Sequence, residues 1–188
     1  MDHIVLITGE RGVGKTYLCQ RVVEEAQRRG YTCAGLLSPA YFEGREKVGI
    51  SLVDVASGEE RPLATADDVP GGARSGRYRF ADWTVEWGTR ILAEARPCDL
   101  LVVDELGPLE LEKGQGFVHA LDVLAKGRFC LALVVVRPEL LDEVRGRLRG
   151  EELDVVEVTL ANREKLPLQI VRRLAERGEE PDLRSSSK

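Results

Sequence analysis

A glycine-rich segment near the N-terminus has the composition and spacing needed to hold a chain of phosphates. Residues 9–16 read GERGVGKT, which fits the pattern G-x-x-x-x-G-K-[ST]. Its glycines allow turns that aim backbone N–H groups at an anion, and the following helix presents its positive end to the same anion. Lys15 is expected to reach the β and γ phosphates, and the Thr16 hydroxyl to face Mg²⁺. The expected nucleotide contacts are Gly9, Glu10, Arg11, Gly12, Val13, Gly14, Lys15, Thr16 and Tyr17.

Two adjacent acidic residues are the second group that could do chemistry. Residues 100–105 read LLVVDE, which is typical of a buried strand that ends in a carboxylate. In proteins with a phosphate loop such an Asp holds the Mg²⁺ shell, so Asp104 joins Thr16 as a candidate metal ligand. Glu105 points in another direction as the strand ends, and it could deprotonate a water aimed at the γ phosphate. The alternative for both carboxylates is a helix cap or a solvated loop charge.

A third carboxylate follows in LGPLELEKGQGF, residues 106–117. Gly107 and Pro108 predict a tight turn, which brings Glu110 near the acidic pair. Two interpretations of Glu110 stay open at this point. Either it supports the metal or the attacking water from one step away, or it is a plain exposed acid.

The elements that must position these residues are indicated by apolar runs of strand length. Continuous runs of Val, Leu and Ile are typical of strands buried on both faces of a parallel sheet. The runs are residues 4–8, 33–38, 100–104, 131–136 and 155–160. Apolar residues at helical spacing predict helices around residues 18–26, 117–124, 140–148 and 170–174. Gly30 is expected to end the first helix, and the last tolerates Pro167 in its first turn.

Residues 41–80 interrupt this alternation of strands and helices. The pattern predicts a strand over residues 47–55, a turn at residues 57–60 and a return strand over residues 60–64. The loop DDVPGGARSG and a short strand over residues 77–80 precede a helix from residue 82 to about residue 95. We therefore expect an antiparallel insertion on the edge of an α/β core.

Composition and charge argue against several classes of protein. The 188 residues include 27 basic and 32 acidic side chains, a formal charge of −5, so bulk charge gives no basic face for nucleic acid. No apolar run approaches the roughly 20 residues of a membrane helix, and the N-terminus lacks the basic flank of a signal peptide. The four cysteines and two histidines have no zinc-binding spacing. Reduced core thiols are expected instead, which favours a cytoplasmic location.

Three stretches together resemble one known family. GERGVGKT, then VVDELGPLEL at residues 102–111 and TLANR at residues 159–163, are similar to the thermophile-type nucleoside-triphosphatase family, which includes the human cancer-related nucleoside-triphosphatase. DELGPLEL is the most specific of these marks, and residues 35–63 resemble the hairpin insertion of the family. The resemblance implies a RecA-like variation of the phosphate-loop fold. It also implies Mg²⁺-dependent hydrolysis of several nucleoside triphosphates to diphosphate and phosphate.

Three further residues become candidates in a RecA-like sheet. In that order, the strand of residues 131–136 lies between the phosphate-loop strand and the Asp104 strand, and ligands sit at the carboxyl ends of such strands. Arg137 would then face the γ phosphate and stabilise charge in the transition state, unless it is a surface residue opening the next helix. Asn162 and Arg163 follow the last strand, where a nucleotide base often rests, and a guanidinium stacks on any base. The alternative for Asn162 is a cap near the last helix.

The sequence thus predicts one α/β domain over residues 1–177, with a RecA-like, mainly parallel sheet flanked by helices, a small antiparallel insertion at residues 41–80, and a polar tail at residues 178–188. The expected activity is Mg²⁺-dependent hydrolysis of ATP, GTP, CTP and UTP with broad base tolerance. Lys15, Glu105 and Arg137 are the expected catalytic residues. No membrane or nucleic-acid partner is expected.

Two alternatives to this activity stay open. A nucleotide or small-molecule kinase would need an acceptor pocket and an Arg-bearing lid, for which Arg77 and Arg79 are the only candidates. A kinase also has no need for a water-activating Glu105. The other alternative is a nucleotide-dependent switch or an ATPase module for a protein partner, which slow turnover accelerated by that partner would favour.

Overall fold

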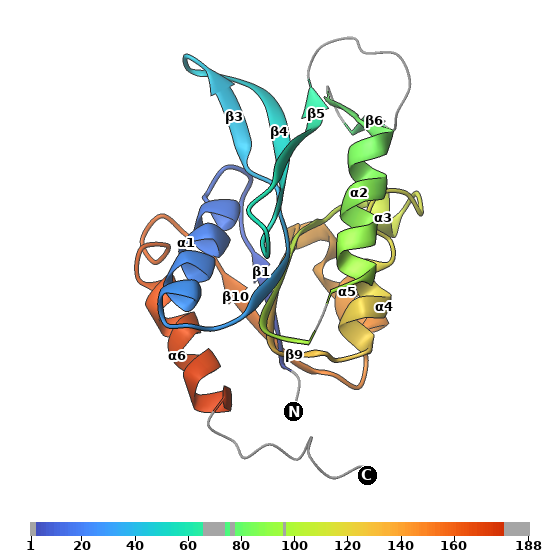
Figure 1. Cartoon of the computed structure of the whole chain (residues 1–188). Helices are drawn as coiled ribbons and strands as arrows, with labels where there is room; N and C mark the ends of the chain where they lie inside the picture. The colour runs from blue at the N-terminus through green and yellow to red at the C-terminus, as the bar shows by residue number, and fades with distance from the viewer. Residues whose placement is uncertain (1–2, 66–73, 76–77, 96, 179–188) are drawn as a thin grey trace.

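The computed structural model describes residues 3–65, 74–75, 78–95 and 97–178. Within these ranges ten strands form one mixed sheet, in the order β10-β1-β9-β8-β2-β4-β5-β7-β6, with β3 paired to β4 (Figure 1). Five strands make its parallel part: β1 (His3–Thr8), β2 (Cys33–Leu37), β8 (Cys98–Leu106), β9 (Phe129–Val136) and β10 (Glu152–Glu157). The strand β9 lies between β1 and β8, as a RecA-like order predicts.

Helices cover both faces of the parallel strands, and each face has its own apolar core (Figure 1). On one face, α1 (Lys15–Arg28) and α6 (Leu166–Gly178) pack on side chains such as Val5, Ile7 and Leu133. On the other face, α2 (Asp82–Ala93), α4 (Ala120–Ala125) and α5 (Leu141–Arg147) pack on side chains such as Ile4 and Leu6. The short helices α3 (Pro108–Leu111) and η1 (Pro138–Leu140) follow β8 and β9. Alternate side chains of β1 therefore pack into the core on one face or the other, which explains the unbroken apolar run in this strand.

The antiparallel insertion is confirmed, and it joins the sheet through β2. It contains β4 (Glu46–Asp54), β5 (Glu60–Thr65) and β7 (Tyr78–Phe80), each paired antiparallel to its neighbour. Two strands escaped prediction. All four side chains of β3 (Ala40–Glu43) are exposed, so the segment has no buried face to give it a pattern. The strand β6 (Arg74–Ser75) has only two residues, in a segment rich in turn formers.

Several predicted boundaries were wrong. The last parallel strand covers residues 152–157 rather than 155–160, and Leu160 lies beyond it with 72% of its surface exposed. This strand pairs only with β1 at the sheet edge, and its side chains are exposed or half-buried, so it is not buried on both faces. Phe117 precedes the helix α4 rather than starting it, and α2 ends at Ala93. Arg77 and the tail from residue 179 lie outside the described residues.

One glycine sets how closely two strands can approach beside the site. Gly35 in β2 has φ +107°, and a Cβ atom there would lie 2.0 Å from the carbonyl oxygen of Val102 in β8. Any side chain larger than hydrogen would push these two strands apart. Gly35 therefore lets the carboxyl end of β2 lie against the carboxyl end of β8, where the acidic pair is found.

Candidate active site

The phosphate loop connects β1 to α1, as predicted. Gly9, Gly12 and Gly14 all have positive φ values, of 136°, 80° and 106°. A Cβ atom at Gly9 would stand 2.5 Å from the carbonyl oxygen of Val158, so this position admits only glycine. The helix α1 begins directly after Gly14, so its positive end faces the loop. The backbone thus has the form that a phosphate-binding loop requires.

Lys15 is half-buried at the start of α1 and its ammonium lies against the loop. Its Nζ atom donates to the carbonyl oxygens of Gly9 and Glu10, at 2.7 and 2.9 Å. Burial lowers the pKa of Lys15, and the negative charges of Glu105 and Asp104 partly oppose that decrease. The positive charge of Arg137 lowers the pKa of Lys15 further. One ammonium therefore lies within electrostatic reach of all three residues predicted to surround the phosphates.

Asp104 is buried, with 2% of its surface exposed, and a serine holds it in place. The Ser38 N–H donates to Asp104 Oδ2 at 3.1 Å, and the Ser38 hydroxyl donates to the Asp104 carbonyl oxygen. The Thr16 hydroxyl also bonds to this carboxylate. Burial, followed by the charge of Glu105, raises the pKa of Asp104 to about 6, although these hydrogen bonds and Lys15 act in the opposite direction. The buried carboxylate therefore lacks a full counter-charge.

These oxygen atoms suit a hard divalent cation. Thr16 and Asp104 offer a hydroxyl and a carboxylate, which are the ligand types that Mg²⁺ prefers. In the part of the chain that the structure describes, no cluster of three or more His, Cys, Asp or Glu residues could hold a metal alone. Mg²⁺ sites commonly combine one or two protein groups with substrate phosphates and water, so the small donor set fits this ion.

Glu105 and Arg137 meet at the carboxyl ends of neighbouring strands. Arg137 follows β9 directly, and its Nε and Nη2 atoms each lie 3.0 Å from Glu105 Oε1. About a third of each side chain is exposed, 35% for Arg137 and 36% for Glu105. Arg137 also directly precedes η1, so it opens that short helix as the alternative expected, while its ion pair places it beside the acidic pair. Its role toward the γ phosphate stays a prediction.

Glu110 is not a plain exposed acid, since 8% of its surface is accessible. Its Oε2 atom accepts the Gly107 N–H at 2.8 Å and its Oε1 atom accepts the Phe117 N–H at 3.2 Å. Burial raises the pKa of Glu110, while these two N–H groups lower it. Both oxygens are engaged by the backbone, so Glu110 holds the loop after β8 in place, and its support of the metal or the water stays a prediction.

Asn162 and Arg163 follow β10 and differ in what their side chains bind. The Asn162 amide accepts from the Thr159 N–H at 2.8 Å and donates to the Glu157 carbonyl at 2.9 Å, so both its ends serve its own loop. It does not cap α6, which begins at Leu166. Arg163 Nη1 approaches the Val13 carbonyl oxygen at 3.4 Å, which places this guanidinium against the phosphate loop.

Tyr17 lies on the same side of the loop as Arg163. Its hydroxyl donates to Glu164 Oε2 at 3.4 Å, and Glu164 Oε1 accepts from Arg163 Nε at 3.2 Å. The tyrosine side chain is largely open to solvent, with 42% of its surface exposed. Tyr17 and Arg163 therefore offer an aromatic face and a guanidinium next to the phosphate loop.

Sequence reasoning missed Ser38. The signal was present, because Ser38 directly follows β2, and the carboxyl ends of parallel strands meet at one edge of the sheet. The pairing of β2 with β8 could not be read from the chain, and without it Ser38 is one serine among many. The lid candidate Arg79 lies in β7, in register with Thr65 and Arg74 of the neighbouring strands.

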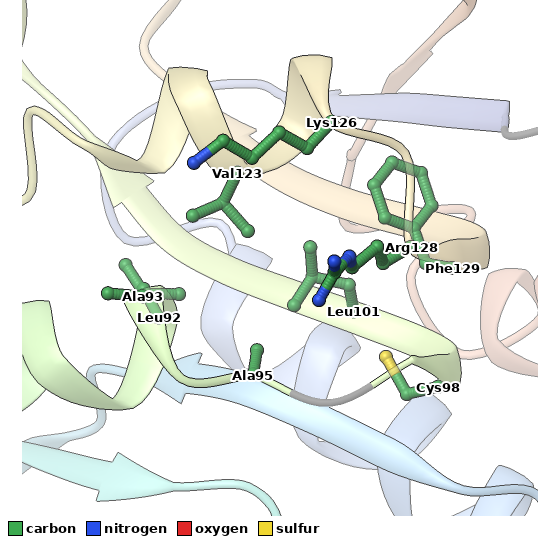
Figure 2. Close-up of a pocket in the computed structure, with 9 residues that line it drawn as sticks. All are labelled: Leu92, Ala93, Ala95, Cys98, Leu101, Val123, Lys126, Arg128 and Phe129. Atoms are coloured by element: carbon green, nitrogen blue, oxygen red, sulfur yellow. The ribbon is translucent and has the colours of Figure 1, made fainter.

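One partly apolar cavity lies away from the candidate site. A cavity of about 210 Å³ lies at the amino ends of β8 and β9, the opposite end from Asp104 and Arg137. Figure 2 shows its lining, which includes Leu92, Leu101 and Phe129 together with the cations Lys126 and Arg128. This cavity therefore lies apart from the phosphate loop and the acidic pair.

The fold and the site define a class of protein. A parallel sheet whose first strand leads into a glycine-rich phosphate loop, and whose β8 strand ends in a buried Asp104 next to Glu105, is a phosphate-loop NTPase fold. The family model described as NTPase matches residues 4–171, and the chain belongs to this family.

Similar proteins support this assignment. The nucleoside-triphosphatase THEP1 of Methanopyrus kandleri is 36% identical over 179 residues, which cover 94% of this chain and 97% of that protein. The solution structure of a human cancer-related nucleoside triphosphatase is 27% identical with a TM-score of 0.70, covering 99% of this chain and 100% of that one. The crystal structure of THEP1 from Aquifex aeolicus, at 22% identity and a TM-score of 0.63, covers 91% and 98% and shows the same fold.

Among the described residues, no helix is both long enough and apolar enough to cross a bilayer.

Proposed function

We propose that this chain hydrolyses nucleoside 5'-triphosphates to the diphosphate and phosphate, with Mg²⁺ and with broad tolerance of the base. The observation that carries the proposal is the position of Glu105 beside buried Asp104 near the carboxyl end of β8. The phosphate loop follows the carboxyl end of β1, so both groups lie at the same end of the parallel strands. The names of the relatives agree with it, since the Methanopyrus kandleri protein and the human protein are both called nucleoside triphosphatases.

The first task of the site is to bind the triphosphate. Backbone N–H groups of the loop and the start of α1 would hold the phosphates, and Lys15 would leave the Gly9 and Glu10 carbonyls to contact them. Thr16 and Asp104 would hold Mg²⁺, which when bound neutralises charge on the phosphate oxygens. The pKa of Asp104 is about 6, so this carboxyl is ionised at neutral pH and able to take that place.

The second task is to activate water. Glu105 would orient a water molecule and accept its proton as the oxygen attacks the γ phosphorus. Arg137 would stabilise the charge that develops on the transferred phosphoryl group, as an arginine supplied within the same chain. A kinase would instead direct the γ phosphate to an acceptor, and it would have no use for an acidic side chain that prepares water.

The side chains beside the loop support broad base tolerance. Arg163 and Tyr17 would stack on a base without reading its edge, because every base has a π face. Asn162 is the only asparagine in the chain, and both ends of its amide already serve its loop. Large selectivity requires buried groups that the wrong base leaves unpaired, and the described residues offer none at this position.

Domain organisation and cellular location are also part of the proposal. We propose that residues 1–177 work as one domain with residues 41–80 as an insertion, which the continuity of the sheet supports. We also propose a cytoplasmic location, because Cys19, Cys33, Cys98 and Cys130 are all free thiols.

Phosphate release from ATP, GTP, CTP and UTP tests the proposal directly. The expected result is release from all four with Mg²⁺, none with a chelator, and no stimulation by added phosphate acceptors. Transfer of label from the γ position to an acceptor in place of water would identify a kinase. Negligible turnover that a protein fraction restores would identify a partner-dependent switch.

A further inference from the structure

The acidic pair and the arginine after β9 are joined in a way that hydrolysis by itself does not require. Arg137 directs both Nε and Nη2 at the same oxygen, Glu105 Oε1, at 3.0 Å each. We propose that this ion pair is a latch, closed until the γ phosphate of a bound triphosphate takes over the guanidinium. The latch rests on the proposed function, which assigns Glu105 to the water and Arg137 to the γ phosphate.

The closed latch occupies one oxygen of the carboxylate that must act on water. Arg137 Nε donates to Glu105 Oε1 and Nη2 lies 3.0 Å from the same oxygen, so while the pair is closed a water proton has to go to the other oxygen, Oε2. The closed latch also holds Arg137 away from the phosphates, just as the Gly9 and Glu10 carbonyls hold Lys15. Both cations of the site are thus bound to the protein itself, and each must change partner when a triphosphate enters.

The latch is built to open. About a third of each partner is exposed, and an ion pair in contact with water is weak. A terminal phosphate carries more charge than a carboxylate and accepts paired N–H bonds from a guanidinium, so it competes well for Arg137. The charges of Glu105 and Arg137 shift the pKa of Lys15 in opposite directions, which places both within range of the cation that reaches the β and γ phosphates.

The turn after β8 leaves room for this exchange. A Cβ atom at Gly107 would stand 3.4 Å from Glu105 Oε1 and 3.9 Å from Arg137 Nε. The backbone there is extended, with φ −121°, so the glycine is not required by the chain's conformation. The missing side chain leaves a small space beside the pair, which Glu110 Oε2 also borders at 3.5 Å, and within which the Glu105 carboxylate can shift when the guanidinium leaves.

The latch makes Arg137 a determinant of triphosphate over diphosphate binding. A diphosphate has no γ phosphate, so the pair stays closed and Arg137 contributes nothing to its affinity. Calorimetric titration with Mg²⁺ plus either ADP or a non-hydrolysable ATP analogue measures this in Glu105→Gln, Arg137→Ala and the double variant. Arg137→Ala should weaken analogue binding about 10- to 100-fold and leave ADP affinity unchanged.

Glu105→Gln should release the arginine and strengthen analogue binding about two- to fivefold, with ADP affinity unchanged. In the double variant this gain should vanish, because there is no guanidinium left to release. Glu139→Gln is the matched control, since Glu139 also raises the pKa of Lys15 but, among the described residues, forms no ion pair with Arg137. It should change the affinities for ADP and the analogue equally, if at all.

Three results would overturn the latch: equal loss of ADP and analogue affinity in Arg137→Ala, equal gain for both ligands in Glu105→Gln, or a gain that survives in the double variant. None of these concerns turnover. The proposed function fails separately, if Glu105→Gln hydrolyses ATP at the wild-type rate. Unchanged ADP affinity also shows that each variant keeps an intact loop.

Discussion

At the scale of single residues, the site brings a cation, a buried carboxylate and a half-exposed carboxylate to the end of one loop. Lys15 donates to a carbonyl oxygen of the loop, and Asp104 accepts hydrogen bonds from Ser38 and Thr16. Glu105 forms an ion pair with Arg137. Each of these side chains is therefore held by a partner within the protein.

Lys15→Ala should abolish both triphosphate binding and turnover. The Lys15 ammonium lies on the carbonyls of the loop itself, and charge-assisted bonds to a multiply charged ligand are among the strongest available. Calorimetry with the ATP analogue measures the loss, and Lys126→Ala, at the far end of the sheet, is the control that should bind normally. Wild-type affinity in Lys15→Ala would show that the loop has only a structural role.

Asp104→Asn should stabilise the metal-free protein while raising its Mg²⁺ requirement. Because burial raises the pKa of Asp104 to about 6, the native state keeps a proton that the unfolded chain loses at lower pH. The stability of the wild type therefore falls as pH rises from the ordinary Asp value to about 6, and stays lower above it. Urea unfolding in chelator should show the variant about 1 to 2 kcal/mol more stable at pH 8, and equal to the wild type near pH 4.

A variant that is less stable than the wild type at pH 8 would contradict this account of Asp104. It would mean that the hydrogen bonds from Ser38 and Thr16 outweigh the cost of burying the charge. The predicted Mg²⁺ requirement is measured as the Mg²⁺ concentration that supports half-maximal turnover. This concentration should be higher for Asp104→Asn than for the wild type.

At the scale of elements, the approach of β2 to β8 decides whether Asp104 is held. Gly35→Ala should destabilise the fold by about 2 to 4 kcal/mol, because it combines a positive φ with a clash against the Val102 carbonyl. Gly58→Ala is the matched control, since Gly58 has φ +75° with no atom within 4 Å of the added Cβ. Its cost should be about 1 to 2 kcal/mol, and urea unfolding compares the two.

Equal losses in Gly35→Ala and Gly58→Ala would show that the β2–β8 contact can relax, and that only the backbone conformation matters. If the Gly35→Ala variant folds, its Mg²⁺ requirement for turnover can also be measured. Its Mg²⁺ requirement should rise, because Ser38 would no longer reach Asp104.

Elements with a buried face could be predicted, and those without one could not. The strands β1, β8 and β9 carry unbroken apolar runs because both their faces are covered. The strands β3 and β10 have mostly exposed side chains, so their patterns resemble those of loops and their positions were missed or shifted. The loop and the acidic pair follow from spacing, whereas Ser38 depends on which strands are neighbours, which only the folded sheet specifies.

At the scale of the whole molecule, the chain is a helix-covered parallel sheet extended by an antiparallel arm. Figure 1 shows the β3–β4 hairpin projecting past the body on the side of α1. The loop, the acidic pair and the arginine all lie at the carboxyl ends of the parallel strands. The residues proposed to contact the triphosphate thus come from the body, and few of the described side chains near the loop are left to contact a base edge.

ATP, GTP, CTP and UTP should therefore be hydrolysed with kcat/KM values within about one to two orders of magnitude of each other. Arg163 and Tyr17 would stack on any base, and the Asn162 amide is already engaged. Steady-state phosphate release with each nucleotide measures the spread. A preference above about 10³ for one base would require a pocket whose groups hydrogen-bond to the base edge, and would contradict broad base tolerance.

The most direct test of the central claim, hydrolysis by a water that Glu105 activates, is single-turnover phosphate release from Mg-ATP by Glu105→Gln, beside Glu139→Gln as the control of equal charge change. The account predicts that Glu105→Gln still binds the nucleotide and releases phosphate about 10²-fold more slowly or worse, while Glu139→Gln stays close to the wild type. Release from Glu105→Gln at the wild-type rate would contradict it.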